Sequence, residues 1–121
     1  MTNYNIEPDM SAACHTPDVI EMPYRPPLFN SELPEKKLYT YRLGGPTCLA
    51  GDIIGDYSFD KPLNDGDGLI FEDMAIYSTC KNNTFNGMPL PDIWAIKKNG
   101  EFELLARFGY DDFKYRLGSR S

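Results

Sequence analysis

Histidine and tryptophan occur once each in this chain of 121 residues, and cysteine occurs only three times. The single histidine, His15, excludes a multi-histidine metal site within one chain, and the cysteines include no Cys-x-x-Cys pair. We therefore expect no metal ion, no Cys-based zinc site and no disulfide framework. The odd cysteine count favours a reducing compartment, which predicts a cytoplasmic protein.

Long apolar runs and clustered basic residues are also missing. No segment approaches the roughly 20 apolar residues that a membrane-spanning helix needs. The N-terminus has neither the basic region nor the apolar core of a signal peptide. With 12 Lys and Arg against 18 Asp and Glu, the net charge is −6. This balance disfavours nucleic acid as a partner, because phosphate binding requires clustered cations, and it is compatible with a cationic partner or substrate.

The motifs of several large enzyme classes are absent as well. The chain has no P-loop, no dinucleotide fingerprint, no His-Glu-x-x-His and no Gly-x-Ser-x-Gly. These absences exclude the corresponding nucleotide, zinc and serine hydrolase sites as first interpretations.

Turn-forming residues are abundant, and short strand patterns lie between them. The 10 glycines and 10 prolines argue against a helical bundle. Residues 38–43 alternate as a strand does, residues 64–68 form a strong turn signal, and residues 93–98 and 101–108 flank an Asn-Gly pair typical of a two-residue primed hairpin turn. Residues 69–77 should begin as a buried strand and end as a short helix or a second strand. We predict one mainly β domain over 1–121, a barrel or sandwich.

The N-terminal third is less regular. Residues 1–8 read as a frayed start or a partial strand, and we expect 1–8 and 118–121 to be poorly ordered. Residues 9–18 are compatible with a strand or a close-packed turn. Residues 19–22 are too few for a stable helix before Pro23.

The stretch 44–57 is the most unusual part of the sequence, because four glycines surround a thiol and two carboxylates. It predicts a glycine-rich turn that approaches another molecule closely. Cys48 is either a small buried residue or a functional thiol. Asp52 and Asp56 either cap neighbouring backbone N–H groups or receive a cation.

Three further side chains have both a structural and a functional interpretation. His15 is a structural hydrogen-bonding residue or a ligand. Asp18 is a surface carboxylate or a member of a polar cluster with His15. Tyr77 is a core tyrosine with its hydroxyl at the rim, or a residue whose hydroxyl binds a ligand phosphate.

Three ordered motifs resemble the C-terminal domain of fold-type III pyridoxal-phosphate decarboxylases, the group of ornithine and diaminopimelate decarboxylases. They are Gly-Pro-Thr-Cys at 45–48 with Asp52, Phe-Glu-Asp-Met-Ala-Ile-Tyr at 71–77, and Thr-Phe-Asn-Gly at 84–87. The longer segments 11–26 and 48–57 resemble the branch that decarboxylates carboxynorspermidine and carboxyspermidine. The resemblance runs from about Asp9 to Leu117.

The resemblance implies an enzyme with an N-terminal (β/α)8 barrel, a C-terminal β-domain, pyridoxal 5'-phosphate as cofactor, and a homodimer with shared active sites. The barrel supplies the Schiff-base lysine in that family. None of the lysines here lies in a matching motif (Lys36, Lys37, Lys61, Lys81, Lys97, Lys98 and Lys114). We therefore expect these residues to be a C-terminal part that is inactive alone and that works with the missing barrel.

The resemblance also assigns roles to individual residues. Cys48 matches a catalytic thiol that enters the partner subunit's site and guides protonation after CO2 leaves. Tyr77 matches a cofactor-binding tyrosine that contacts the phosphate, and Asp52 matches an aspartate near the subunit interface. Asp18 is the first candidate to bind a substrate amine.

His15 and Glu21 are the next candidates for the amine, because ammonium groups need charge-assisted acceptors. Leu49 replaces the acidic residue that ornithine-type enzymes carry after the cysteine, which suits a carboxylated polyamine better than a short diamino acid. A non-catalytic β-domain that binds a full-length decarboxylase or another protein is the alternative.

Overall fold

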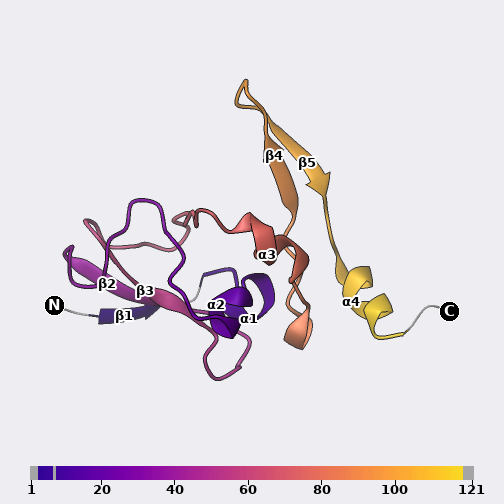
Figure 1. Ribbon diagram of the computed structural model, residues 1–121, viewed down its shortest axis with the longest axis horizontal. Coiled ribbons are helices and arrows are strands. Elements are labelled where there is room, and N and C mark those ends of the chain that lie inside the picture. The colour runs from indigo at the N-terminus through magenta and orange to yellow at the C-terminus, as the bar shows by residue number, and fades with distance from the viewer. Residues whose placement is uncertain (1–2, 7, 119–121) are drawn as a thin grey trace.

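The computed structural model describes residues 3–6 and 8–118. Its elements, in chain order, are β1 (Asn3–Ile6), α1 (Ala12–His15), α2 (Asp18–Glu21), β2 (Tyr39–Gly44), β3 (Ile53–Phe59), α3 (Ala75–Cys80), the 3-10 turn η1 (Phe85–Gly87), β4 (Ile93–Ile96), β5 (Phe102–Ala106) and α4 (Tyr110–Arg116). Figure 1 shows a three-stranded sheet at one end, short helices in the middle and a projecting hairpin, with α4 beyond it. Across the described ranges, no helix has the length and apolar character to cross a membrane.

The three-stranded sheet has β2 at its centre, with β3 antiparallel on one side and β1 parallel on the other. The strand predicted over 38–43 is confirmed. Its Tyr41 and Leu43 are buried while Arg42 between them is exposed, as the two-residue period of a strand requires. At the start of the chain, residues 3–6 form the partial strand; positions 1–2 and 7 lie outside the described residues.

β3 supplies the aromatic half of the core. The ring of Phe59 meets the edge of Tyr41 at 5.9 Å between centroids, and Tyr57 meets Phe71 in the same way at 6.1 Å. The Tyr57 hydroxyl donates a hydrogen bond of 2.6 Å to the carbonyl of Pro26. The prediction of one turn over 44–57 is therefore wrong in its second half, because cross-strand aromatic packing makes a strand there despite the glycine at 55.

The helices α1 and α2 occupy a region where no stable helix was expected. Each is a single turn, and α2 ends before Pro23. The Ser11 side chain caps α1 by accepting a hydrogen bond from the Cys14 N–H. Helices this short are unstable alone, so the burial of Ala12, Cys14 and Val19 supplies the stabilisation.

Residues 69–77 do not begin as a buried strand. Ile70 is 61% exposed, and Phe71 forms only an isolated bridge with Leu28. The predicted short helix follows as α3. The turn expected over 64–68 is confirmed by the hydrogen bond from the Asp67 N–H to the Asn64 carbonyl, 3.1 Å.

The C-terminal hairpin of β4 and β5 is confirmed, but its turn differs from the prediction. Lys97 pairs with Glu101, and the Gly100 N–H donates to the Lys97 carbonyl at 2.9 Å. Gly100 alone in this turn has a positive φ, of 86°, whereas a two-residue primed turn would need one at Asn99 too. The connection is thus a three-residue loop with its glycine in the left-handed region.

The described residues form one three-stranded and one two-stranded sheet, and neither closes into a barrel nor packs face to face on the other (Figure 1). The mainly β prediction is confirmed in this coarser form. The closed barrel or sandwich is not found, because the hairpin stands apart from the sheet instead of extending it.

Candidate functional site

The loop 45–52 connects β2 to β3 and carries Cys48; we call it the Cys48 loop. Cys48 is exposed and has a φ of 63°, in the left-handed region that non-glycine residues seldom adopt. A small buried residue is therefore the wrong interpretation for Cys48, while Cys14 on α1 is the buried one. A strained backbone of this kind persists only where surrounding contacts hold it.

Asp52 holds the Cys48 loop from the inside. Its carboxylate accepts hydrogen bonds from the Ser11 hydroxyl (2.8 Å), the Ala13 N–H (3.1 Å), the Thr47 N–H (3.3 Å) and the Thr47 hydroxyl. Asp52 is only 5% exposed. Burial acts to raise its pKa, but the hydrogen bonds from Thr47, Ala13 and Ser11 outweigh burial and hold the pKa below its ordinary value.

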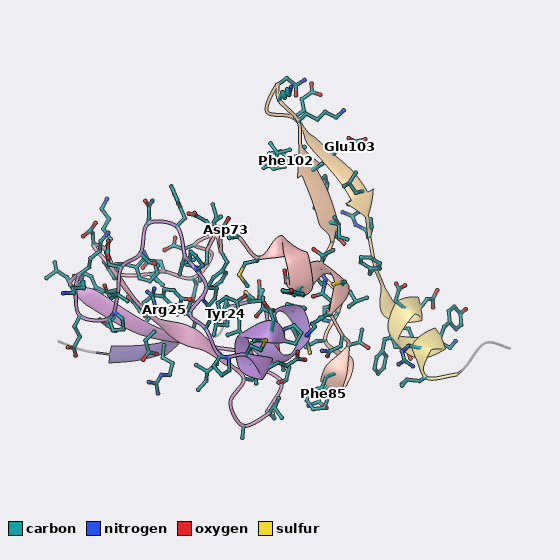
Figure 2. All side chains as sticks on the ribbon, viewed as in Figure 1. Tyr24, Arg25, Asp73, Phe85, Phe102 and Glu103 are labelled. Carbon is teal, nitrogen blue, oxygen red and sulfur yellow. The ribbon has the colours of Figure 1, made fainter. Side chains whose placement is uncertain are left out.

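The third sequence motif, residues 84–87, lies against both α1 and the Cys48 loop. The Asn86 side chain donates to the Thr47 carbonyl at 2.6 Å, and the Cys14 thiol lies 3.4 Å from the Phe85 carbonyl. Asn83 donates to the Ala13 carbonyl at 2.8 Å. Phe85 itself, the first residue of η1, is 45% exposed (Figure 2). The fold thus brings two of the three motifs together around α1.

His15 ends α1, and both of its ring nitrogens have partners. Nδ1 accepts from the Ser11 N–H at 3.2 Å, which leaves Nε2 to donate to the Pro89 carbonyl at 2.8 Å. This arrangement matches the structural interpretation of His15 and leaves no ring nitrogen free for a substrate.

Asp18 begins α2 and is paired with Tyr24. The Tyr24 hydroxyl donates to Oδ2 of Asp18 at 2.6 Å, whereas Oδ1 is buried without a hydrogen-bond partner among the described residues. Burial, followed by the Asp18 carboxylate, raises the pKa of Tyr24 to about 12. Figure 2 shows Tyr24 in the middle of the molecule, beside the short helices.

Glu21 and Tyr77 both lie close to Lys81. Lys81 Nζ lies 2.6 Å from Oε2 of Glu21 and 5.7 Å from the ring centroid of Tyr77. The neighbouring Glu21 raises the pKa of Lys81. Tyr77 is 58% exposed on α3, so the interpretation as a core tyrosine is wrong. Lys81 therefore lies close both to Glu21, one of the predicted amine-binding residues, and to Tyr77, the predicted phosphate-binding residue.

Asp56 lies apart from these groups. It is on β3, where it forms a two-bond ion pair of 2.8 and 2.9 Å with Arg42, and Arg42 holds its pKa below the ordinary value. Within the described part of the chain, no group of three or more His, Cys, Asp or Glu side chains is placed to hold a metal ion.

The predicted site residues differ in exposure, and Asp52 is buried. A cavity of about 560 Å³ lies beside the 64–68 turn, and none of the predicted site residues lines it. The thiol of Cys48 and the ring of Tyr77 are exposed.

Sequence reasoning missed Ser11, Thr47 and Tyr24. Thr47 and Asn86 lie inside motifs that the sequence identified, but the sequence did not predict what either side chain binds. Nothing in the sequence pairs Ser11 with Asp52, because the two are 41 positions apart.

Comparison with known proteins gives a consistent result. Residues 4–75 match the family model "Pyridoxal-dependent decarboxylase, C-terminal sheet domain". The chain is 52% identical over 110 residues to carboxyaminopropylagmatine decarboxylase of Synechocystis sp., covering 91% of this chain and 28% of that protein. It is 38% identical over 120 residues to carboxynorspermidine/carboxyspermidine decarboxylase of Campylobacter jejuni, covering 89% of this chain and 31% of that protein.

A solved structure agrees with these relatives. Carboxynorspermidine decarboxylase of Campylobacter jejuni, crystallised with norspermidine, superposes with a TM-score of 0.87 at 35% identity over 93% of this chain and 34% of that one. The chain thus spans about a third of the length of the proteins that it matches.

Proposed function

Because the chain belongs to the pyridoxal-dependent decarboxylases, whose C-terminal sheet domain it matches, we propose that it forms the C-terminal sheet domain of an enzyme that decarboxylates carboxynorspermidine or carboxyspermidine. The products are norspermidine or spermidine, in cytoplasmic polyamine biosynthesis. The observation that carries the proposal is the exposed Cys48 thiol, held in a strained loop against α1 and the 84–87 motif.

A second substrate is favoured by the relative at 52% identity, which is named for carboxyaminopropylagmatine. By their names, both candidates are carboxylated cationic chains. Acidic side chains are suited to the cationic groups of either one, so the rates of CO2 release from carboxyaminopropylagmatine and from the carboxylated polyamines distinguish the two candidates.

Two of the described residues, Tyr77 and Lys81, fit the phosphate group of pyridoxal phosphate. Tyr77 offers an exposed hydroxyl donor, and the Lys81 ammonium lies beside its ring; both suit a phosphate dianion. When bound, the cofactor withdraws electrons from the substrate α-carbon so that the bond to the carboxylate breaks. The remaining contacts of the cofactor belong to an N-terminal barrel domain.

Asp18 and Glu21 are the acidic side chains that bind the cationic groups of the substrate in this proposal. Tyr24 already donates to one oxygen of Asp18, whereas the other oxygen lacks a donor. A substrate ammonium would supply the missing donor as a charge-assisted hydrogen bond. Its approach requires a small displacement of the side chains that bury this oxygen.

Cys48 acts on the proton that replaces the departing carboxylate. Its exposed thiol is free to enter the active site of a partner subunit in a homodimer, where it directs that proton to one face of the α-carbon. In this arrangement Asp52 supports the subunit interface from within the chain.

Complementation tests the proposal. The 121-residue chain, mixed with a separately expressed N-terminal barrel of the Campylobacter jejuni relative and pyridoxal phosphate, should release CO2 from the carboxylated polyamines, and the chain alone should release none. We expect Cys48→Ala to lower the restored rate at least about tenfold. Cys80→Ala, which alters the other exposed cysteine, should leave it unchanged.

Three outcomes contradict the proposal. CO2 release by the chain alone would refute its inactivity. Association with the barrel without activity would favour a non-catalytic binding domain, and no association would count against the enzyme.

A further inference from the structure

We propose that Asp52 is a positioning residue that fastens α1 to the Cys48 loop, so that the thiol and the start of the substrate segment move as one unit. The inference rests on the proposed function in one respect, because Cys48 and α1–α2 are taken as the thiol and the substrate segment. The coupling itself follows from the contacts.

The two oxygens of the Asp52 carboxylate bind two segments far apart in sequence. Oδ1 accepts from the Ala13 N–H on α1, while Oδ2 accepts from the Ser11 hydroxyl before α1 and from Thr47 in the Cys48 loop. The Ser11 hydroxyl in turn accepts from the Cys14 N–H and caps α1. Loss of the carboxylate would therefore leave donors unpaired on both segments at once.

Backbone hydrogen bonds of the Cys48 loop and the glycine at position 45 fix the position of the Asp52 carboxylate. The Gly45 N–H donates to the Asp52 carbonyl at 2.8 Å, and the Asp52 N–H donates to the Leu49 carbonyl at 3.0 Å, which closes the loop on itself. A Cβ at position 45 would lie 2.4 Å from Oδ2 of Asp52, closer than real atoms approach. Glycine is thus required for the carboxylate to reach both segments.

Cys48 depends on this closure because its own conformation is unfavourable. A non-glycine residue in the left-handed region is sterically strained, because its Cβ lies too close to the backbone. Thr47 precedes it and is held on three sides, by Asp52 at its N–H and hydroxyl and by Asn86 at its carbonyl. Asp52 is buried and affects the thiol only through its hydrogen bonds with Thr47. It is therefore a positioning residue and not a catalytic one.

Hydrogen exchange of the 121-residue chain, read by mass spectrometry on peptides, tests the coupling. In Asp52→Asn we expect exchange to rise at least about tenfold in both 11–16 and 45–52, with the β2–β3 sheet unchanged. Ser11→Ala should raise exchange in 45–52 as well, although it lies outside that segment. Asp56→Asn removes a second aspartate of lowered pKa that contacts neither segment, and it should leave both unchanged.

A rise in only one segment, or an equal rise throughout the sheet, would overturn the proposal. If Asp52→Asn does not fold, Ser11→Ala and Thr47→Ala carry the test. Each removes one hydrogen bond to the Asp52 carboxylate together with one local backbone bond, and each should raise exchange on the opposite segment.

Thiol labelling supplies a readout that a purely structural role would not change. In folded Asp52→Asn, N-ethylmaleimide should label Cys48 at least about threefold faster relative to Cys80 in the same molecule, because a freed loop presents the thiol in more orientations. An unchanged ratio would overturn the positioning role. Neither readout needs decarboxylation, so failure of the proposed function and failure of this inference remain distinguishable.

Discussion

Among single residues, Tyr24 offers the clearest pH signature of the site. Burial and the Asp18 carboxylate raise its pKa to about 12, from about 10 in the unfolded chain. A raised folded-state pKa adds stability that is fully present below about pH 10 and is lost as the pH rises through about 12. The Tyr24 hydroxyl should therefore contribute to folding at neutral pH and cease to do so in alkali.

We expect Tyr24→Phe to lose less stability than the wild type when the pH is raised from about 9 to about 11, because the variant has no proton to lose at this position. Urea midpoints at the two pH values measure the difference. Tyr110→Phe, on the exposed surface of α4, is the control and should match the wild type. An equal alkaline loss in Tyr24→Phe would contradict the raised pKa of Tyr24 in the folded chain.

At this scale the sequence indicated which residue types matter but not their partners. The thiol and carboxylates of 44–57 were visible from composition alone. That Asp52 turns inward to Ser11 while Asp56 faces Arg42 depends on the strand register between β2 and β3. The sequence does not reveal that register, because the glycines of 44–57 predict a turn where β3 lies.

Among the elements, the Cys48 loop has the least space for an added side-chain atom, at Gly45. Gly45→Ala would place a methyl group 2.4 Å from Oδ2 of Asp52, so the carboxylate must move and its hydrogen bonds break. We expect a loss of about 1–3 kcal/mol of unfolding free energy, measured by urea denaturation.

Gly68→Ala is the matched control for this loop. No atom lies within 4 Å of a Cβ at that position, so the substitution should change stability by less than about 0.5 kcal/mol. Equal effects of the two substitutions would contradict the close approach of Gly45 to Asp52.

Elements with local patterns were predictable, and elements held by distant contacts were not. β2 shows the alternation of side chains typical of a strand, and the hairpin contains an Asn-Gly pair typical of a turn. Both patterns lie within a few residues. α1 and α2 are single turns stabilised by burial of Ala12, Cys14 and Val19 in a core that other segments build, so short-range propensity predicts no helix there.

For the whole molecule, the decisive feature is the apolar surface of the hairpin. Ile96 is 70% exposed, its cross-strand partner Phe102 69% and Trp94 48%, and Figure 2 shows Phe102 and Glu103 on opposite sides of the hairpin. An isolated two-stranded hairpin is marginally stable, and exposed apolar patches promote association.

We therefore expect the 121-residue chain to self-associate, as measured by sedimentation over a range of concentrations. Phe102→Lys should shift the chain towards monomer, while Lys98→Glu at the hairpin turn should not. A clean monomer of the wild type at high concentration would contradict the expectation.

The global architecture was predictable only in outline. Glycine and proline content indicates many short strands, and the described residues bear this out. Barrel closure was not predictable, because whether the hairpin joins the sheet depends on surfaces that no local pattern encodes.

The pairing of Ser11 with Asp52 across 41 positions also sets an order of events during folding. A hairpin such as β4–β5 closes a short loop and forms within about 1–10 μs. The Asp52 carboxylate can reach α1 only after two segments 41 positions apart have met, and a closure of this length has a larger entropic cost than a local hairpin. We therefore expect the Cys48 loop to be fastened to α1 later than the β4–β5 hairpin forms.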